Sequence, residues 1–394
     1  EWVDDALRSV GVLHGGDHVR SIRVAHLSYG GVGLSGDTVR VFLEGEGSGL
    51  PASLIAKFPT AVVANRGMIE GFDGYAREIA FYRDLATEVP VRVPGHFGSA
   101  MDPARFAGAA DAAAKVVNWL PPRAHLALTA DITKFMRPTK RRYVLLIEDM
   151  GADTVVHDLE EPPSVEQLCE VAGCLAELHA SFWGRRDLAD HPATRTLVTE
   201  IPRVFVNVLR GRCRPMAEAR WGAWLTDADR RRLDEATDRF ADDLAVINEP
   251  HTFVHGDPRS DNILFGAGDP IMLDWAMSSV AHPGYDVGYL LGSSLRRDDK
   301  GRAGEILDAY LGPLGGAGVH LERPELVRGV AASARVGLVL QMNSLAVLEG
   351  GYGDNLPADL WMPRLLGLLE GVDEIAAVSC PQQRITRSRA RRPS

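Results

Sequence analysis

Residues 254–275 read VHGDPRSDNILFGAGDPIMLDW, and this stretch decides the fold. Three polar residues, Asp257, Asn262 and Asp274, lie among apolar segments that have the composition of β-strands. A buried charge without a partner costs several kcal/mol, so carboxylates beside buried strands indicate a function. We therefore expect a small β-hairpin that holds these three side chains at one site.

The spacing of the three residues points to phosphate chemistry. Four residues separate Asp257 from Asn262, and Asp274 follows shortly after them. The catalytic loop of kinases has the same Asp-x-x-x-x-Asn interval, with a metal-binding Asp downstream. In that chemistry one Asp orients the attacking hydroxyl, while the Asn and the second Asp hold Mg²⁺ against the phosphates of ATP. The pattern predicts Asp257 as the catalytic residue and Asn262 and Asp274 as metal ligands, rather than a polar turn with a helix cap.

A lysine and a glutamate upstream complete this pattern. Lys57 ends the apolar segment SLIAKF, and Glu78 lies on the apolar side of a helix expected over residues 72–87. By itself Lys57 reads as an edge residue whose ammonium reaches solvent. Arg77 or Arg83 are alternative partners for Glu78. With the catalytic loop downstream, we expect a Lys57–Glu78 ion pair that binds the nucleotide phosphates.

Two further segments are candidates for nucleotide contacts. The turn YGGVGLSGD (29–37) lies between two expected strands, and the amides around Gly31 and Gly33 could cover phosphates. It matches neither the kinase G-x-G-x-x-G pattern nor a Walker A loop, so this prediction depends on its position. The strand YVLLIEDM ends at Glu148, Asp149 and Met150, whose backbone we expect to contact the adenine; a plain buried strand fits the same residues.

Two residues are predicted to support the catalytic loop. His255 precedes Asp257 by two positions, and an imidazole there more often braces the loop than transfers protons. Asp286, in GYDVGYLL, starts an expected helix, where a bracing or capping role is more common than metal binding.

Composition excludes several classes of protein. The chain has 394 residues, 45% of them hydrophobic, and a formal net charge of −10, which argues against nucleic-acid binding. Residues 381–394 carry five arginines and are expected to be a disordered basic tail. The four cysteines show no metal-ligand or disulfide spacing, and there is neither a signal peptide nor a long apolar run. These features predict a cytoplasmic protein that is not inserted in a membrane.

The order of the expected elements predicts two lobes. Residues 1–150 combine β-rich segments with one long helix, and residues 101–140 read as an insertion within them. Residues 151–380 are mostly helical, with expected helices at 197–209, 227–247, 284–296, 302–312, 325–348 and 358–376. We therefore predict an α+β fold with an N-terminal nucleotide-binding lobe and a C-terminal catalytic and substrate-binding lobe.

The motifs resemble a known family. HGDPRSDNILF followed by MLDW is similar to the aminoglycoside phosphotransferase and choline kinase superfamily, and residues 20–370 share the resemblance. The segments PASLIAKFP, YAREIAFYRDL, LLIEDMG and LAELHASFW resemble its ecdysteroid-kinase-like branch. The resemblance implies a bilobal protein-kinase-like fold that uses ATP and Mg²⁺ to phosphorylate a hydroxyl of a small molecule.

Other functions remain open at this point. The same fold could belong to a catalytically silent nucleotide-binding protein, to an aminoglycoside-inactivating enzyme or to a protein kinase, although no Ala-Pro-Glu follows Asp274. Aromatic and Met residues at 185–225 and 330–365, among them Trp361, hint at a lipophilic alcohol as acceptor; they also suit an ordinary core. The oligomeric state cannot be deduced from these patterns.

Overall fold

A computed structural model of the chain describes residues 1–27, 36–71, 73–103, 116, 119–121, 123–125, 127, 141–151, 153–194, 206–347 and 357–379. Gly31 and Gly33, most of the expected insertion at 101–140 and the basic tail at 381–394 lie outside these residues.

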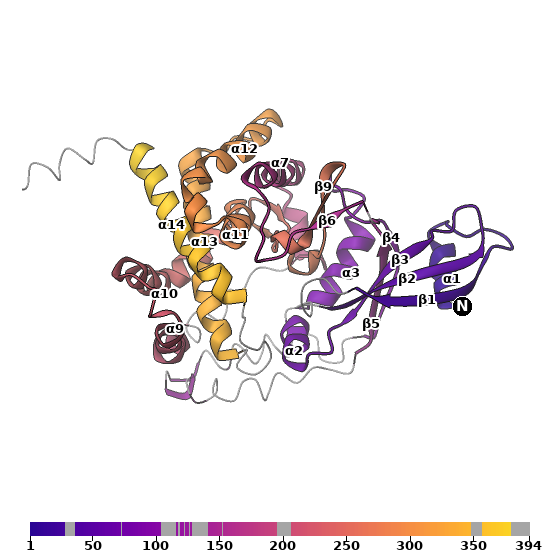
Figure 1. The fold of residues 1–394 in the computed structure, drawn as a ribbon, viewed down its shortest axis with the longest axis horizontal. Coiled ribbons are helices and arrows are strands. Elements are labelled where there is room, and N and C mark those ends of the chain that lie inside the picture. The colour runs from indigo at the N-terminus through magenta and orange to yellow at the C-terminus, as the bar shows by residue number, and fades with distance from the viewer. Residues whose placement is uncertain are drawn as a thin grey trace, which may run out of the picture.

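The N-terminal part is a five-stranded antiparallel sheet in the order β1-β2-β3-β5-β4. Its strands are β1 (His18–His26), β2 (Gly36–Glu46), β3 (Ser53–Pro59), β4 (His96–Met101) and β5 (Tyr143–Glu148). Three helices accompany the sheet: α1 (Trp2–Ser9), α2 (Val63–Gly71) and α3 (Gly74–Asp84). In Figure 1 this sheet forms one end of the molecule, and α3 lies between it and the helical part.

The period of two along the strands sends neighbouring side chains to opposite faces of this sheet. Leu54 and Ala56 of β3 pack in a small core with Leu7 of α1. On β5, Leu145 belongs to the large core that also contains α3. Lys57 follows Ala56, so alternation directs it toward the α3 face. The strand pattern thus determines which face the lysine reaches.

The rest of the chain is mainly helical, as predicted. Its long helices are α7 (Val165–Ser181), α10 (Asp227–Ile247), α11 (Gly284–Ser294), α12 (Ala303–Gly316), α13 (Arg323–Val347) and α14 (Pro357–Ser379), and α9 (Arg214–Trp221) is shorter. Short strands lie between this bundle and the large sheet: β6 (Val155–Val156), β7 (Thr252–Val254), β8 (Ile263–Gly266), β9 (Gly268–Met272) and β10 (Ser279–Ala281). The antiparallel β8–β9 pair is the expected hairpin.

Local sequence signals explain several of these helices. Ser164 and Gln167 form the predicted capping box of α7, and Thr226 with Asp229 forms a second one that starts α10. The helix expected at 72–87 begins at Gly74 and ends at Asp84. Helix α2 was not predicted. The helix expected at 197–209 falls largely outside the described residues, and residues 209–213 form a π-helical turn before α9.

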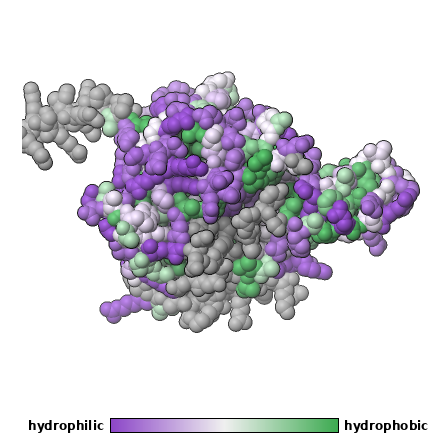
Figure 2. All heavy atoms as spheres, in the orientation of Figure 1, coloured by the Kyte–Doolittle hydropathy of each residue, from purple (hydrophilic) through white to green (hydrophobic). Residues whose placement is uncertain are grey.

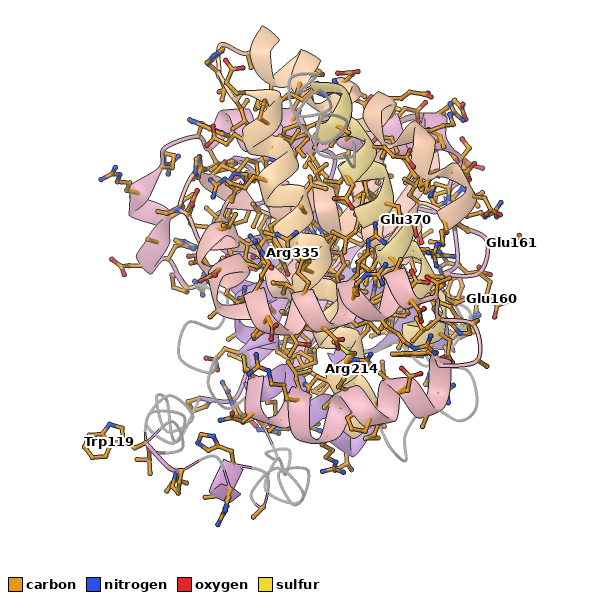
Figure 3. All side chains as sticks on the ribbon, turned by 90° about the vertical axis from the view of Figure 1, so that its left-hand side faces the viewer. Trp119, Glu160, Glu161, Arg214, Arg335 and Glu370 are labelled. Carbon is orange, nitrogen blue, oxygen red and sulfur yellow. The ribbon has the colours of Figure 1, made fainter. Side chains whose placement is uncertain are left out.

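Ion pairs between helices lie on the face opposite the sheet. Figure 3 shows Arg335 on α13 and Glu370 on α14 in this region. Arg335 makes two hydrogen bonds of 2.7 Å to buried Asp243 of α10, and Glu370 accepts from Lys300 at 2.5 Å. Within the expected insertion Trp119 is 94% exposed and points away from the body of the protein.

The visible surface of the helical part is mostly hydrophilic, with separate hydrophobic patches (Figure 2). No helix in the described part of the chain combines the length and the hydrophobicity needed to cross a bilayer.

Candidate active site

Asp257 lies in the turn after β7, and the two residues before it shape this turn. Gly256 has a φ angle of 87°, and a Cβ atom there would collide with the carbonyl oxygen of Met277, so this position requires glycine. His255 accepts the Asp257 amide at Nδ1 (3.2 Å) and donates from Nε2 to the carbonyl of Leu273 (2.8 Å). Burial lowers the pKa of His255. Its two ring nitrogens are thus engaged within the loop and not turned to a ligand.

The buried carboxylate of Asp286 on α11 accepts hydrogen bonds from the backbone of the same turn. Its Oδ2 accepts hydrogen bonds from the His255 amide (2.7 Å) and from Nε2 of His179 (3.1 Å). Its Oδ1 accepts from the Gly256 amide (2.8 Å). Because His179 donates through Nε2, its Nδ1 accepts from the hydroxyl of Tyr310 (2.9 Å). These contacts connect Asp286 to the loop and to α7.

The β8–β9 hairpin brings Asn262 and Asp274 to the same end of its two strands. Ile263 pairs with Met272, and the amide of Leu273 donates to the carbonyl of Asn262 (2.9 Å). Nδ2 of Asn262 donates to the backbone carbonyl of Asp257 (2.9 Å). This bond assigns the amide orientation and turns Oδ1 away from that carbonyl. The interval between Asp257 and Asn262 is therefore used to close the loop.

Trp275 anchors the turn that presents Asp274. Asp274 adopts a left-handed conformation with φ 59°, which Asp tolerates better than most residues. The next residue, Trp275, is fully buried and stacks on Phe81 of α3 with ring centres 3.9 Å apart. On β7, Phe253 lies parallel to it at 5.9 Å. One aromatic stack therefore ties the Asp274 turn to the sheet-side helix and to the strand before the catalytic loop.

Lys57 and Glu78 form the expected ion pair. Nζ of Lys57 also lies 3.9 Å from Oδ1 of Asp274. Oε2 of Glu78 accepts a hydrogen bond from the hydroxyl of Tyr143 (2.8 Å), which holds the glutamate in place. Burial alone would lower the pKa of Lys57, but the charges of Asp274 and Glu78 outweigh it and raise this pKa. Lys57 is therefore a fixed ammonium beside Asp274.

The alternative partners of Glu78 are engaged elsewhere. Arg83 pairs with Asp84 at 2.5 Å on the surface. Buried Arg77 donates to the carbonyl of Ser278, just after the Asp274 turn. Helix α3 thus reaches that turn twice, through this hydrogen bond and through the aromatic stack.

The segment expected to contact adenine, Glu148 to Met150, ends β5. Asp149 accepts hydrogen bonds from Nε (2.6 Å) and Nη2 (3.0 Å) of Arg40, so its side chain joins β5 to β2. The amide of Glu148 donates to the carbonyl of Gly95 (2.8 Å) and is not available to a base.

The sequence reasoning missed two residues that contact the carboxyl group of Asp257. Tyr289 on α11 lies close enough to lower its pKa, and Nε of Arg259 lies 3.9 Å from its Oδ1. Among the described residues Oδ1 of Asp257 has no hydrogen-bond partner. Burial raises the pKa of Asp257 to about 7, although Arg259 and Tyr289 act to lower it. A signal for Tyr289 was present, because it follows Asp286 by three positions on one helix.

The aromatic and Met residues considered for the acceptor are mostly interior. Trp221, Met342 and Trp361 are buried, while Trp224 is 41% exposed. Among the described residues most of these side chains are therefore buried.

A second group of possible metal ligands, Glu249, His251 and His282, lies at the opposite end of β7 from Asp257. The amide of Gly284 donates to Nδ1 of His282 (3.0 Å), and burial lowers the pKa of His282 to about 4. Neutral His282 therefore carries its proton on Nε2 and offers no lone pair there. Arg328 holds both oxygens of Glu249. We interpret this group as a hydrogen-bonded brace.

The chain is similar to known proteins in its sequence family and in its fold. Residues 34–322 match the phosphotransferase enzyme family. No curated protein matches the chain. Among solved structures the chain is similar to a choline kinase from Cryptosporidium parvum, with 12% identity, a TM-score of 0.50 and 91% of each chain covered. A choline/ethanolamine kinase family protein from Mesorhizobium loti has 17% identity and a TM-score of 0.49, with 94% of this chain and 98% of that chain covered.

The family match covers most of the chain, so the protein belongs to the phosphotransferase enzyme family and is a small-molecule kinase. This confirms the superfamily that the motifs resemble. The likeness to the Cryptosporidium enzyme confirms the predicted α+β kinase-like fold, and at 12% identity it speaks for the fold alone.

Proposed function

We propose that the protein transfers the γ-phosphate of ATP to a hydroxyl of a small molecule. One observation carries the proposal: the ammonium of Lys57 lies 3.9 Å from Asp274, whose hairpin partner Asn262 is hydrogen-bonded to the backbone of Asp257. A cation for phosphates, two oxygen donors for a metal and a buried carboxylate for a hydroxyl are the parts that phosphoryl transfer needs.

The donor set fits Mg²⁺. The two candidate ligands, Asn262 and Asp274, offer oxygen atoms, which Mg²⁺ prefers, and Oδ1 of Asn262 is turned away from the loop carbonyl by the bond that Nδ2 makes. Bound Mg²⁺ would neutralise charge on the β- and γ-phosphates. Lys57, held by Glu78, would neutralise part of the remaining charge.

Asp257 would act on the acceptor. We propose that its Oδ1 accepts a hydrogen bond from the acceptor hydroxyl and takes the proton late in the transfer, while Tyr289 and Arg259 hold the carboxylate in position. His255 and Asp286 would support the loop through their bonds to its backbone. On the nucleotide side we propose the amide of Met150 as a donor to adenine, and the amides around Gly31 and Gly33 as contacts to the phosphates.

We further propose that the chain falls in the ecdysteroid-kinase-like branch of its family, which the four segments quoted above support.

An ATP-consumption screen of the purified protein tests the proposed phosphotransfer function directly. The acceptors should include sterols, sugars, aminoglycosides and amino alcohols, and Asp257→Asn serves as the inactive control. Consumption that depends on one acceptor class supports the proposal; no acceptor-dependent consumption favours a catalytically silent protein.

Replacing Asp274 tests the metal site. Asp274→Asn removes the charge but suits the left-handed backbone, whereas Asp274→Ala also adds strain. Both variants should lose at least about tenfold in affinity for Mg·ATP and should no longer bind ATP more tightly when Mg²⁺ is added. Calorimetry with and without Mg²⁺ measures this. Asp269→Asn, an exposed position on β9, should keep the Mg²⁺ dependence; an unchanged response in Asp274→Asn would contradict the assignment.

The raised pKa of Asp257 predicts an acid limb in the activity profile. The carboxylate is the active form, so kcat/KM should level off above about pH 8 and should fall about tenfold per pH unit well below pH 7. Nearby Mg²⁺ stabilises the carboxylate, so the midpoint for kcat, which reports the ternary complex, should lie at lower pH than that for kcat/KM. A kcat/KM profile that is flat from pH 5 to pH 8 would contradict the proton-acceptor role of Asp257.

A further inference from the structure

Arg259 places a guanidinium beside the catalytic carboxylate. The residue lies two positions after Asp257 and is only 6% exposed. Its Nε lies 2.8 Å from Oδ1 of Asp261 and 3.9 Å from Oδ1 of Asp257, yet it donates a hydrogen bond to neither. The charges of Asp261 and Asp257 hold the guanidinium here, and among the described residues its buried Nε has no hydrogen-bond partner.

Trp361 of α14 lies against the same guanidinium. Cζ of Arg259 is 6.0 Å from the centre of the Trp361 ring. The ring of Tyr289 packs edge-on against Trp361 at 6.2 Å, and the charge of nearby Asp257 acts on the hydroxyl of Tyr289. Trp361 is 8% exposed, and its Nε1 is buried with no hydrogen-bond partner in the described part of the chain. The fold therefore places a second buried donor, the indole N–H of Trp361, on a side chain that contacts Arg259 and Tyr289.

The chemistry of these two groups restricts the ligand that fits them. Guanidinium and indole N–H groups donate hydrogen bonds and accept none. Buried donors without acceptors are destabilising, and a ligand oxygen with lone pairs satisfies them. A carboxylate or phosphate group matches the planar fork of arginine and gains charge assistance.

A cationic acceptor fits poorly at the same place. An ammonium has no lone pair to accept from Arg259 or Trp361, and like charges repel. The ring of Trp361, which could otherwise bind a quaternary ammonium through its face, already has the guanidinium of Arg259 at 6.0 Å. The carboxylate of Asp261 lies 2.8 Å from Nε, so a ligand oxygen would meet the guanidinium at its Nη groups.

We propose that Arg259 and Trp361 form the recognition site for the acceptor, and that the acceptor is an alcohol that also carries an oxyanion, either a carboxylate or a phosphate. The inference rests on the proposed phosphotransfer function in so far as the bound molecule is the acceptor. It does not require phosphoryl transfer for binding to be measured.

Three probes of equal chain length test the proposal: hydroxybutanoate, hydroxybutyl phosphate and aminobutanol. The protein contains seven tryptophans, so fluorotryptophan labelling gives a small set of ¹⁹F signals, and Trp361→Phe identifies the signal of Trp361. At least one oxyanion probe should shift this signal with a Kd about tenfold or more below that of aminobutanol. Comparing the two oxyanion probes distinguishes a carboxylate from a phosphate acceptor.

Matched variants separate recognition from stability. Arg259→Gln should remove the preference for the oxyanion probes, whereas Arg302→Gln should keep it, because half-exposed Arg302 pairs with Glu166 in the first turn of α7. Arg259→Lys retains the charge but not the fork, so it should restore only part of the preference. Unshifted signals of the tryptophans remote from Arg259, compared without probe in Arg259→Gln and in the wild type, show that the fold is retained.

Two results would overturn the inference: aminobutanol binding as tightly as the oxyanion probes, or no shift of the Trp361 signal by either oxyanion probe at saturating concentration. Phosphorylation of the same probes by ATP is measured in parallel. Oxyanion binding at Trp361 without any phosphoryl transfer would leave this inference intact and count against the proposed function. Preferred phosphorylation of aminobutanol would support the proposed function and would count against this inference.

Discussion

Asp257→Asn should lower kcat by about 100-fold or more while Mg·ATP still binds. Asparagine has nearly the same shape, so the loop should keep its structure. Its amide cannot take a proton, and its NH₂ group donates where the carboxylate accepts. The variant therefore removes the chemistry and leaves the surroundings in place. Single-turnover kinetics with an acceptor found in the screen measures the loss.

The control for this variant is Asp269→Asn on the exposed part of the β8–β9 hairpin, which should turn over at the wild-type rate. ATP affinity measured by calorimetry in both variants separates a catalytic defect from a binding defect. Normal turnover by Asp257→Asn would show that Asp257 is not the proton acceptor, whether or not the assignment of the metal ligands is correct.

Asp286→Ala should destabilise the protein by about 3 kcal/mol or more, because it leaves three buried donors without an acceptor. Those donors are the amides of His255 and Gly256 and the Nε2 group of His179. The amide pair belongs to the catalytic turn, so the turn should move and kcat should fall together with stability. Urea unfolding measures the free energy, and kcat is measured well below the unfolding midpoint.

The comparison for this variant is Asp298→Ala, which removes a carboxylate from an exposed site and should change the unfolding free energy by less than about 0.5 kcal/mol. Asp286→Asn keeps one acceptor oxygen and should fall between the two. If Asp286→Ala unfolds at the wild-type urea concentration and retains its kcat, the carboxylate does not hold the loop.

Much of the site was predictable because its signals are local. The interval between Asp257 and Asn262 is spanned by one loop that closes on itself through the Asn262 side chain. Strand alternation assigns Lys57 to the α3 face, and helical spacing assigns Glu78 to the side that meets it. The capping box at Ser164 likewise depends on four consecutive residues. Patterns of this kind need no knowledge of distant parts of the chain.

The contacts that sequence reasoning missed join segments far apart in the chain. Trp275 stacks on Phe81, and Arg259 lies beside Trp361. Neither pair has a periodic signal, because each depends on how helices pack after they have formed. Aromatic residues in the segments around α14 suit a core as well as a binding site, and only their neighbours distinguish the two.

The sequence alone thus predicted the chemistry: two acids, an amide and a lysine at the intervals expected for phosphoryl transfer, on an α+β scaffold. The tertiary structure decided what surrounds Arg259, since it brought Trp361 of a distant helix against the arginine that lies next to Asp257. The physical reason is range. Backbone periodicity and short loops act over a few neighbouring residues, so they can be read from the sequence. Side-chain packing and the low polarity of the interior act between residues that are distant in the chain. They therefore determine the partner and the pKa of a buried side chain only after the chain has folded.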